Sequence, residues 1–145
     1  NPRNYNRDIT VEKADAIVSI AGPAMNMILA IGFTVIYFII YKFWGTLVLT
    51  NRILGIIMQM IMCTITINIG LGIFNLIPLP PLDGSKVIKP FLTYNAKQWF
   101  EDNERIFYII FVILWITGIA GTIISPIINV VFKGIFNLAS MIFKV

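Results

Sequence analysis

Three long stretches of this sequence contain no charged side chain, and they constrain the fold more than any other feature. The stretches cover residues 16–41, 53–82 and 106–124. Each meets the length of roughly 18 residues that an α-helix needs to cross a bilayer. The chain is 58 % hydrophobic and 12 % charged, whereas soluble domains are roughly half apolar and a quarter charged. The sequence therefore predicts an all-α, multi-pass transmembrane bundle of three to four helices.

We expect one membrane domain over residues 1–145. It begins with a polar lead-in at residues 1–15. Three spans are expected at about residues 17–41, 53–77 and 106–124, with a short loop at 42–52 between the first two. A final segment covers residues 127–143. The final segment is either an amphipathic surface helix or a fourth span with its polar stripe turned inward. That stripe consists of Asn129, Lys133, Asn137 and Ser140. Pro23 predicts that the first regular helix begins near residues 21–23.

The second apolar run ends in a cluster of prolines followed directly by a carboxylate. Three of the residues 78–81 are proline, which cannot continue a helix and favours an extended segment before Asp83. Asp83 then stands at the membrane boundary, where a carboxylate is costly unless it is paired, hydrated or bound to a metal. It can also simply open the next loop, pair with Lys86 or cap a short helix over residues 84–87.

Lysine and arginine lie at the ends of the apolar runs, so the net charge of +4 indicates membrane anchors and not a nucleic-acid surface. Counting these cations across alternating spans predicts that the Asp83 side is cytoplasmic; the membrane is expected to be a bacterial cell membrane. The single cysteine, Cys63, falls inside the second span and is interpreted as a packing residue. Asn68 and Lys133 are interpreted in the same way, as helix-packing and snorkelling side chains.

Three motifs resemble those of site-2 proteases (peptidase family M50). Residues 75–86 read Asn-Leu-Ile-Pro-Leu-Pro-Pro-Leu-Asp-Gly-Ser-Lys, similar to the family's Asn-x-x-Pro-x-x-Pro-Leu-Asp-Gly segment. Residues 21–26 resemble its Gly-Pro-x-x-Asn helix, and residues 1–5 resemble the Asn-Pro-Arg-Asn stretch of the branch that lacks a PDZ domain. The resemblance implies a zinc-dependent protease that cleaves transmembrane helices of client proteins.

The resemblance also assigns residues. Asp83 corresponds to the aspartate that joins two histidines of an HExxH helix in holding zinc. Asn75 corresponds to an asparagine that faces the scissile peptide and donates to an oxyanion, with an interhelical hydrogen bond as the alternative. Asn26 would orient substrate or bond across helices, and Gly22 and Pro23 would shape its helix.

No histidine occurs in the 145 residues, so the HExxH helix and its general-base glutamate are missing and the chain alone is expected to be inert. The start at Asn1 and the retained Leu-Asp-Gly motif favour a carboxy-terminal fragment of a longer protease. Two alternatives remain. One is a non-catalytic scaffold of the same fold that binds partner helices, and the other is a transporter component with broken helices.

Overall fold

The computed structural model describes residues 10–144, and this part of the chain is helical with no strand. The Asn1 to Tyr5 motif therefore lies outside the described residues. Two long helices, α1 (Val11–Thr50) and α2 (Arg52–Asn75), form an antiparallel pair. They are separated by Asn51, whose side chain accepts hydrogen bonds from the backbone N–H groups of Ile53 and Leu54 at 2.9 and 3.2 Å and caps α2.

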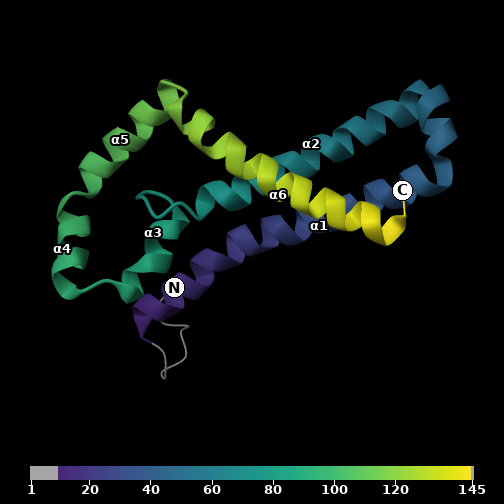
Figure 1. Ribbon diagram of the computed structural model, residues 1–145. Helices are drawn as coiled ribbons and strands as arrows, with labels where there is room; N and C mark the ends of the chain where they lie inside the picture. The colour runs from purple at the N-terminus through teal and green to yellow at the C-terminus, as the bar shows by residue number, and fades with distance from the viewer. Residues whose placement is uncertain (1–9, 145) are drawn as a thin grey trace.

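The remaining elements follow α2 along the chain (Figure 1). They are α3 (Asp83–Ile88) with the 3₁₀ turn η2 (Lys89–Phe91), α4 (Tyr94–Asp102), α5 (Glu104–Ile116) and α6 (Ile119–Phe143). Helix α3 packs on α1 at one end of the long pair, and α4 links it to α5. Helix α6 lies across both α1 and α2. The prediction of an all-α bundle is confirmed.

The core lies where α1, α2 and α6 meet. Ala30 of α1 and Ile65 and Ile69 of α2 are fully buried there. Large side chains of all three helices surround them: Met27, Phe33, Tyr37, Ile61, Ile73, Ile128, Val131, Phe132, Ile135 and Phe136. Most other large apolar side chains of the three helices are exposed, as expected for helices that face lipid. By length and composition, α1, α2 and α6 are each able to cross a membrane.

The first span is longer than predicted at both ends. Helix α1 already begins at Val11, inside the expected polar lead-in, and it continues through the expected loop at 42–52 with a kink at Trp44. The predicted helix start at residues 21–23 was therefore wrong. Pro23 lies inside α1 and is fully buried; packing of its ring offsets the hydrogen bond that a proline removes.

The prediction of one span at 106–124 was also wrong. Helix α5 ends at Ile116, and Gly118 adopts a left-handed conformation (φ 75°) before α6 begins. Such a conformation is readily available only to glycine, so the chain bends there. Helix α6 then runs from Ile119 to Phe143 as one continuous helix, across the expected gap between residues 124 and 127.

The end of α6 fixes the topology of the carboxy-terminal part. The ammonium group of Lys42 donates a 2.8 Å hydrogen bond to the backbone carbonyl of Phe143. Lys42 lies near the end of α1 that is remote from Asp83, so α6 ends on the side of the bundle opposite to Asp83. Residues 127–143 thus form the second part of α6, a helix that is long and apolar enough to cross a membrane. The polar stripe of α6 also points outward, since Asn129, Lys133 and Asn137 are not buried.

Candidate functional site

The segment between α2 and α3 presents Asp83. The helix breaks at the prolines as predicted, but the segment folds into successive turns and not into one extended stretch. The backbone N–H of Leu79 donates to the carbonyl of Ile77 at 2.8 Å, and that of Leu82 donates to Leu79 at 2.9 Å. These bonds satisfy backbone groups that would otherwise be left unpaired beside the membrane. They also bring Asp83 back beside the end of α2.

Gly84 packs directly against the backbone at the end of α2. A Cβ atom built on Gly84 would lie 2.4 Å from the carbonyl oxygens of both Leu76 and Ile77. No side chain is tolerated at such a distance, because the obstructing atoms are backbone. Ser85 follows, buried, with its hydroxyl donating to the carbonyl of Leu82 at 2.7 Å. The glycine of the Leu-Asp-Gly motif therefore allows α3 to dock against the last residues of α2.

Asp83 itself is half-exposed and paired. Its carboxylate lies 3.3 Å from the ammonium group of Lys86, and the two side chains are 40 % and 52 % exposed. An exposed i,i+3 pair of this kind contributes at most about 1 kcal/mol to stability. The ion pair with Lys86 and the short helix α3 both match the structural alternatives that the sequence offers for Asp83. The ion pair leaves the carboxylate reachable from outside the bundle.

Asn26 and Asn75 lie on the two helices that cross beside α3. Gly72 of α2 is buried at this crossing, where a Cβ would lie 2.7 Å from Cε of Met27 and 3.3 Å from the carbonyl oxygen of Pro23. Asn26 precedes Met27 on α1, and Asn75 follows Gly72 by three residues on α2. Both asparagine side chains are partly buried, and neither makes a hydrogen bond within residues 10–144. The structure thus brings together the three elements that carry the predicted site residues.

Three other predicted positions behave differently. Asn68 donates its side-chain amide to the carbonyl of Thr64, one turn earlier in α2, at 2.8 Å. Its hydrogen-bonding capacity is therefore partly used within its own helix. A Cβ atom on Gly22 would meet no other atom within 4 Å, so this glycine makes no close helix contact. Cys63 is exposed on α2 and does not pack inside the bundle as expected.

The described residues do not form a zinc site by themselves. No group of three or more His, Cys, Asp or Glu side chains gathers anywhere in residues 10–144, and the whole sequence contains no histidine. A catalytic zinc ion takes three protein ligands. Asp83 can supply one carboxylate, and residues 10–144 gather no further ligands around it.

A polar pocket of about 120 Å³ lies beside Asp83, between the proline turns and α4. Its wall includes Lys86, Lys89 and Glu101, and the last two form an ion pair at 3.1 Å. Sequence reasoning did not find this pocket, because its walls come from segments that are separated along the chain. Its acidic and basic groups are close to balance, so it has no strong preference for an anion or a cation.

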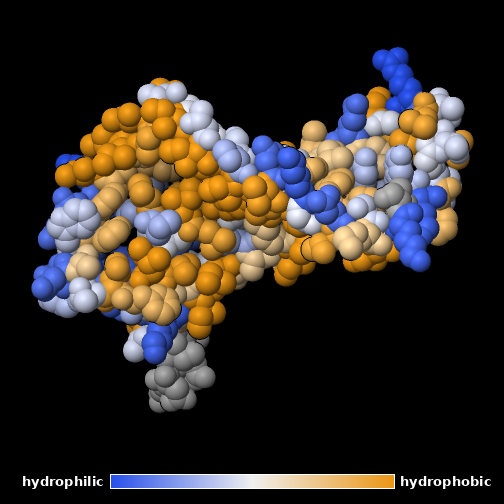
Figure 2. Space-filling model, in the orientation of Figure 1, coloured by the Kyte–Doolittle hydropathy of each residue, from blue (hydrophilic) through white to orange (hydrophobic). Residues whose placement is uncertain are grey.

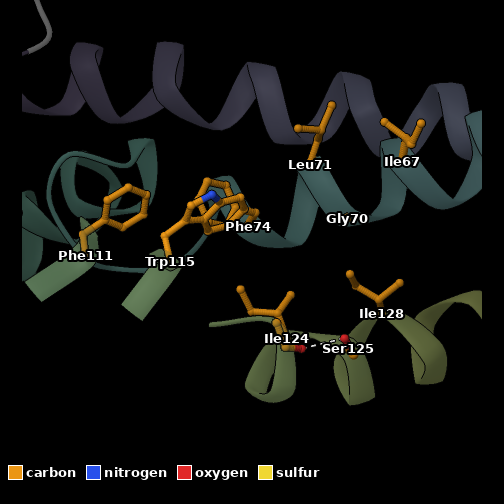
Figure 3. Close-up of a pocket in the computed structure, with 10 residues that line it drawn as sticks. Ile67, Gly70, Leu71, Phe74, Phe111, Trp115, Ile124, Ser125 and Ile128 are labelled. Carbon is orange, nitrogen blue, oxygen red and sulfur yellow. Dashed lines mark hydrogen bonds between the residues drawn. The ribbon is translucent and has the colours of Figure 1, made fainter. Parts of the chain in front are cut away.

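A second groove, of about 550 Å³, is apolar (Figure 3), and Asp83 is not among the residues that line it. It separates α2 from the α5–α6 pair, and the rings of Phe74 and Trp115 close one end with their centroids 5.2 Å apart. The hydroxyl of Ser125 points along α6 and donates to the carbonyl of Gly121 at 2.6 Å. Ser125 supplies the one hydroxyl group in the lining of this groove, and that group is already hydrogen-bonded. The groove therefore suits an apolar occupant.

Comparisons with known proteins agree with the motifs. The model of "Peptidase family M50" matches residues 6–118. The chain is 33 % identical over 132 residues to "Putative zinc metalloprotease YwhC" of Bacillus subtilis (strain 168), an alignment that covers 90 % of this chain. The chain spans 59 % of the length of that relative. No solved structure matches the chain. The family match covers most of the chain, including the turns that present Asp83, and the chain therefore belongs to peptidase family M50, the family of the site-2 proteases.

Proposed function

We propose that this chain is the membrane-embedded part of a zinc metalloprotease that hydrolyses peptide bonds within or near transmembrane segments of client proteins. The observation that carries the proposal is the seating of Gly84 against the end of α2, which presents a reachable Asp83 carboxylate in a chain of this family. Asp83 then acts as one zinc ligand, and the histidines come from an HExxH segment outside this chain. The chain alone is inert.

Asn75 and Asn26 are proposed to contact the client peptide. Each carries a partly buried amide with no hydrogen-bond partner among the described residues, whereas the amide of Asn68 is used by its own helix. A side-chain amide without another partner can donate a hydrogen bond to a substrate carbonyl, or to the oxyanion that develops from it. The support is their position on α1 and α2 beside α3.

The bilayer is the proposed environment of the three long helices, with the Asp83 side in the cytoplasm. No nucleic acid is expected as a partner. Three of the lysines on the Asp83 side are neutralised by carboxylates, in the pairs Lys86–Asp83, Lys89–Glu101 and Lys97–Glu12. Pairing leaves fewer free cations on this side for contacts with phosphates.

The test replaces Asp83 by Asn in the protein produced from its full coding region. Zinc content is measured by elemental analysis, and cleavage of a membrane-anchored substrate is measured in vesicles. We expect Asp83→Asn to lose both zinc and cleavage while still inserting into the membrane. Asp102→Asn, at the exposed end of α4, is the matched control and should retain both. Full zinc content and full cleavage in Asp83→Asn would refute the assignment.

A non-catalytic scaffold is the second candidate, and the absence of histidine from all 145 residues favours it. Under this alternative the complete coding region contains no HExxH, and the purified protein holds no stoichiometric zinc. The same elemental analysis therefore separates the two candidates before any substrate is known.

A further inference from the structure

Helix α6 has two chemically different faces. Its apolar face, which includes Ile128, Phe132 and Phe136, packs on the core formed with α1 and α2. A neighbouring face, turned by about 100° around the helix, carries Asn129, Lys133 and Asn137, which are spaced four residues apart and are not buried. Residues at this spacing lie above one another on a helix. In Figure 2 a hydrophilic band accordingly crosses the otherwise hydrophobic surface over α6.

Lys133 lies deep within α6. It is ten residues before the end of the helix at Phe143, which corresponds to about 15 Å at 1.5 Å per residue. A lysine side chain is roughly 6 Å long, so its ammonium group cannot reach the level of Phe143. The neighbouring turns of α6 pack against Ile65 and Ile69, in the middle of the charge-free run of α2. Lys133 is therefore at hydrocarbon depth.

A charged group at this depth needs a partner. Ionisable side chains inside membranes pair with each other, with backbone carbonyls or with water-filled cavities. Within residues 10–144, the ammonium group of Lys133 makes no ion pair or hydrogen bond, and neither do the side-chain amides of Asn129 and Asn137. The ammonium group has three donors and no acceptor, so its partner must offer acceptors.

We propose that Asn129, Lys133 and Asn137 form a docking surface for a membrane helix that carries an aspartate or glutamate at mid-membrane depth. A carboxylate accepts from Lys133, and the two amides, one turn above and one turn below, fix its position. All three side chains are exposed within residues 10–144, so no other described helix covers the stripe and a second helix can reach it. The surface is independent of the Asp83 site.

Charge complementarity favours this occupant over a second copy of the chain and over a lipid phosphate. A symmetric second copy of the chain would place Lys133 near Lys133, and like charges in a low-dielectric medium repel. A lipid phosphate lies at the membrane surface, beyond the reach of the side chain. A helix with a carboxylate satisfies both the charge and the depth.

The experiment uses Cys63, the single cysteine, which is exposed on α2, to attach a donor dye to the whole chain in phosphatidylcholine vesicles. The probe is a synthetic Leu/Ala helix with an acceptor dye and one central Glu, compared with the same helix carrying Leu at that position. Energy transfer at increasing peptide-to-lipid ratios gives the affinity. We expect the Glu helix to bind about threefold to tenfold more tightly than the Leu helix.

Three variants make the test specific. Lys133→Met should abolish the preference for Glu, and because it makes α6 more apolar it should not impair membrane insertion. Lys133→Arg should retain the preference, as should Lys144→Met, which removes the same charge at the end of α6. Equal binding of both helices, or a preference that persists in Lys133→Met, would overturn the proposal. So would energy transfer between copies of the chain that Lys133→Met abolishes, since the occupant would then be a second copy.

Discussion

Gly84 lies so close to Leu76 that the structure has no space for a side chain between them. A Cβ atom on Gly84 would stand 2.4 Å from the Leu76 carbonyl oxygen. The residue next to the proposed metal ligand is thus in direct contact with the end of the helix that precedes it. The position of Asp83 depends on this contact, because α3 is only six residues long and has little stability of its own.

Replacing Gly84 by Ala should therefore displace α3 from α2. We expect a loss of about 1–3 kcal/mol in stability, as for other over-packed positions, and loss of zinc from the full-length protein. Thermal unfolding in detergent and elemental analysis measure the two effects. Gly22→Ala is the matched control, because a Cβ there meets no atom within 4 Å. Equal stability of the two variants would show that α3 is not held by this contact.

Gly72 offers a graded version of the same experiment. A Cβ on Gly72 would lie 2.7 Å from Cε of Met27, the flexible end of a side chain, and 3.3 Å from a backbone oxygen of Pro23. We expect Gly72→Ala to cost less than Gly84→Ala, about 1 kcal/mol, because the methionine can move. The double variant Gly72→Ala/Met27→Ala should cost less than the two single changes added together. Strict additivity would contradict a direct contact between α1 and α2 at this point.

The ion pair between Lys97 of α4 and Glu12 of α1 should hold α4 against the bundle. Glu12→Gln is expected to destabilise this contact by up to about 1 kcal/mol, with a smaller effect at high salt. Limited proteolysis of residues 89–103 measures the loosening. Exchanging the two charges in Glu12→Lys/Lys97→Glu should restore protection. Protection that is unchanged in the single variant would mean that α4 is held by other contacts, such as the stacked rings of Phe100 and Phe107.

The bond from Lys42 to the carbonyl of Phe143 should protect the last turn of α6. We expect Lys42→Met to increase amide hydrogen exchange in residues 139–143 severalfold, with little change in the middle of α6. Lys144→Met serves as the control, because Lys144 follows the helix end and is exposed. Exchange that rises equally in both variants would contradict a specific role for Lys42.

The membrane character and the broken helix before Asp83 could be predicted because each depends on local chemistry. An apolar run of sufficient length needs lipid, and consecutive prolines interrupt a helix wherever they occur. The short helix after Asp83 and its pairing with Lys86 were considered for the same reason. Contacts such as that between Gly84 and Leu76 could not be predicted, since they depend on how the intervening turns close.

Helix boundaries were less predictable because hydropathy does not distinguish a continuous helix from a bent one. The apolar residues around Gly118 read as one span, yet the left-handed conformation of that glycine divides them. Pro23 predicts a helix start, yet it lies inside α1. Burial decides the case of Pro23, and burial is a property of the folded bundle and not of the local sequence.

The contact between Lys42 and Phe143 also has a consequence for reporter fusions. Because α6 ends at the far end of α1, we expect the end of α6 and the Asp83–Asp102 segment to occupy different compartments, whichever way the protein inserts. A fluorescent protein attached to the tail and a phosphatase inserted next to α4 would both be active in one orientation or both be silent in the other. A mixed result would mean that α6 does not cross the bilayer.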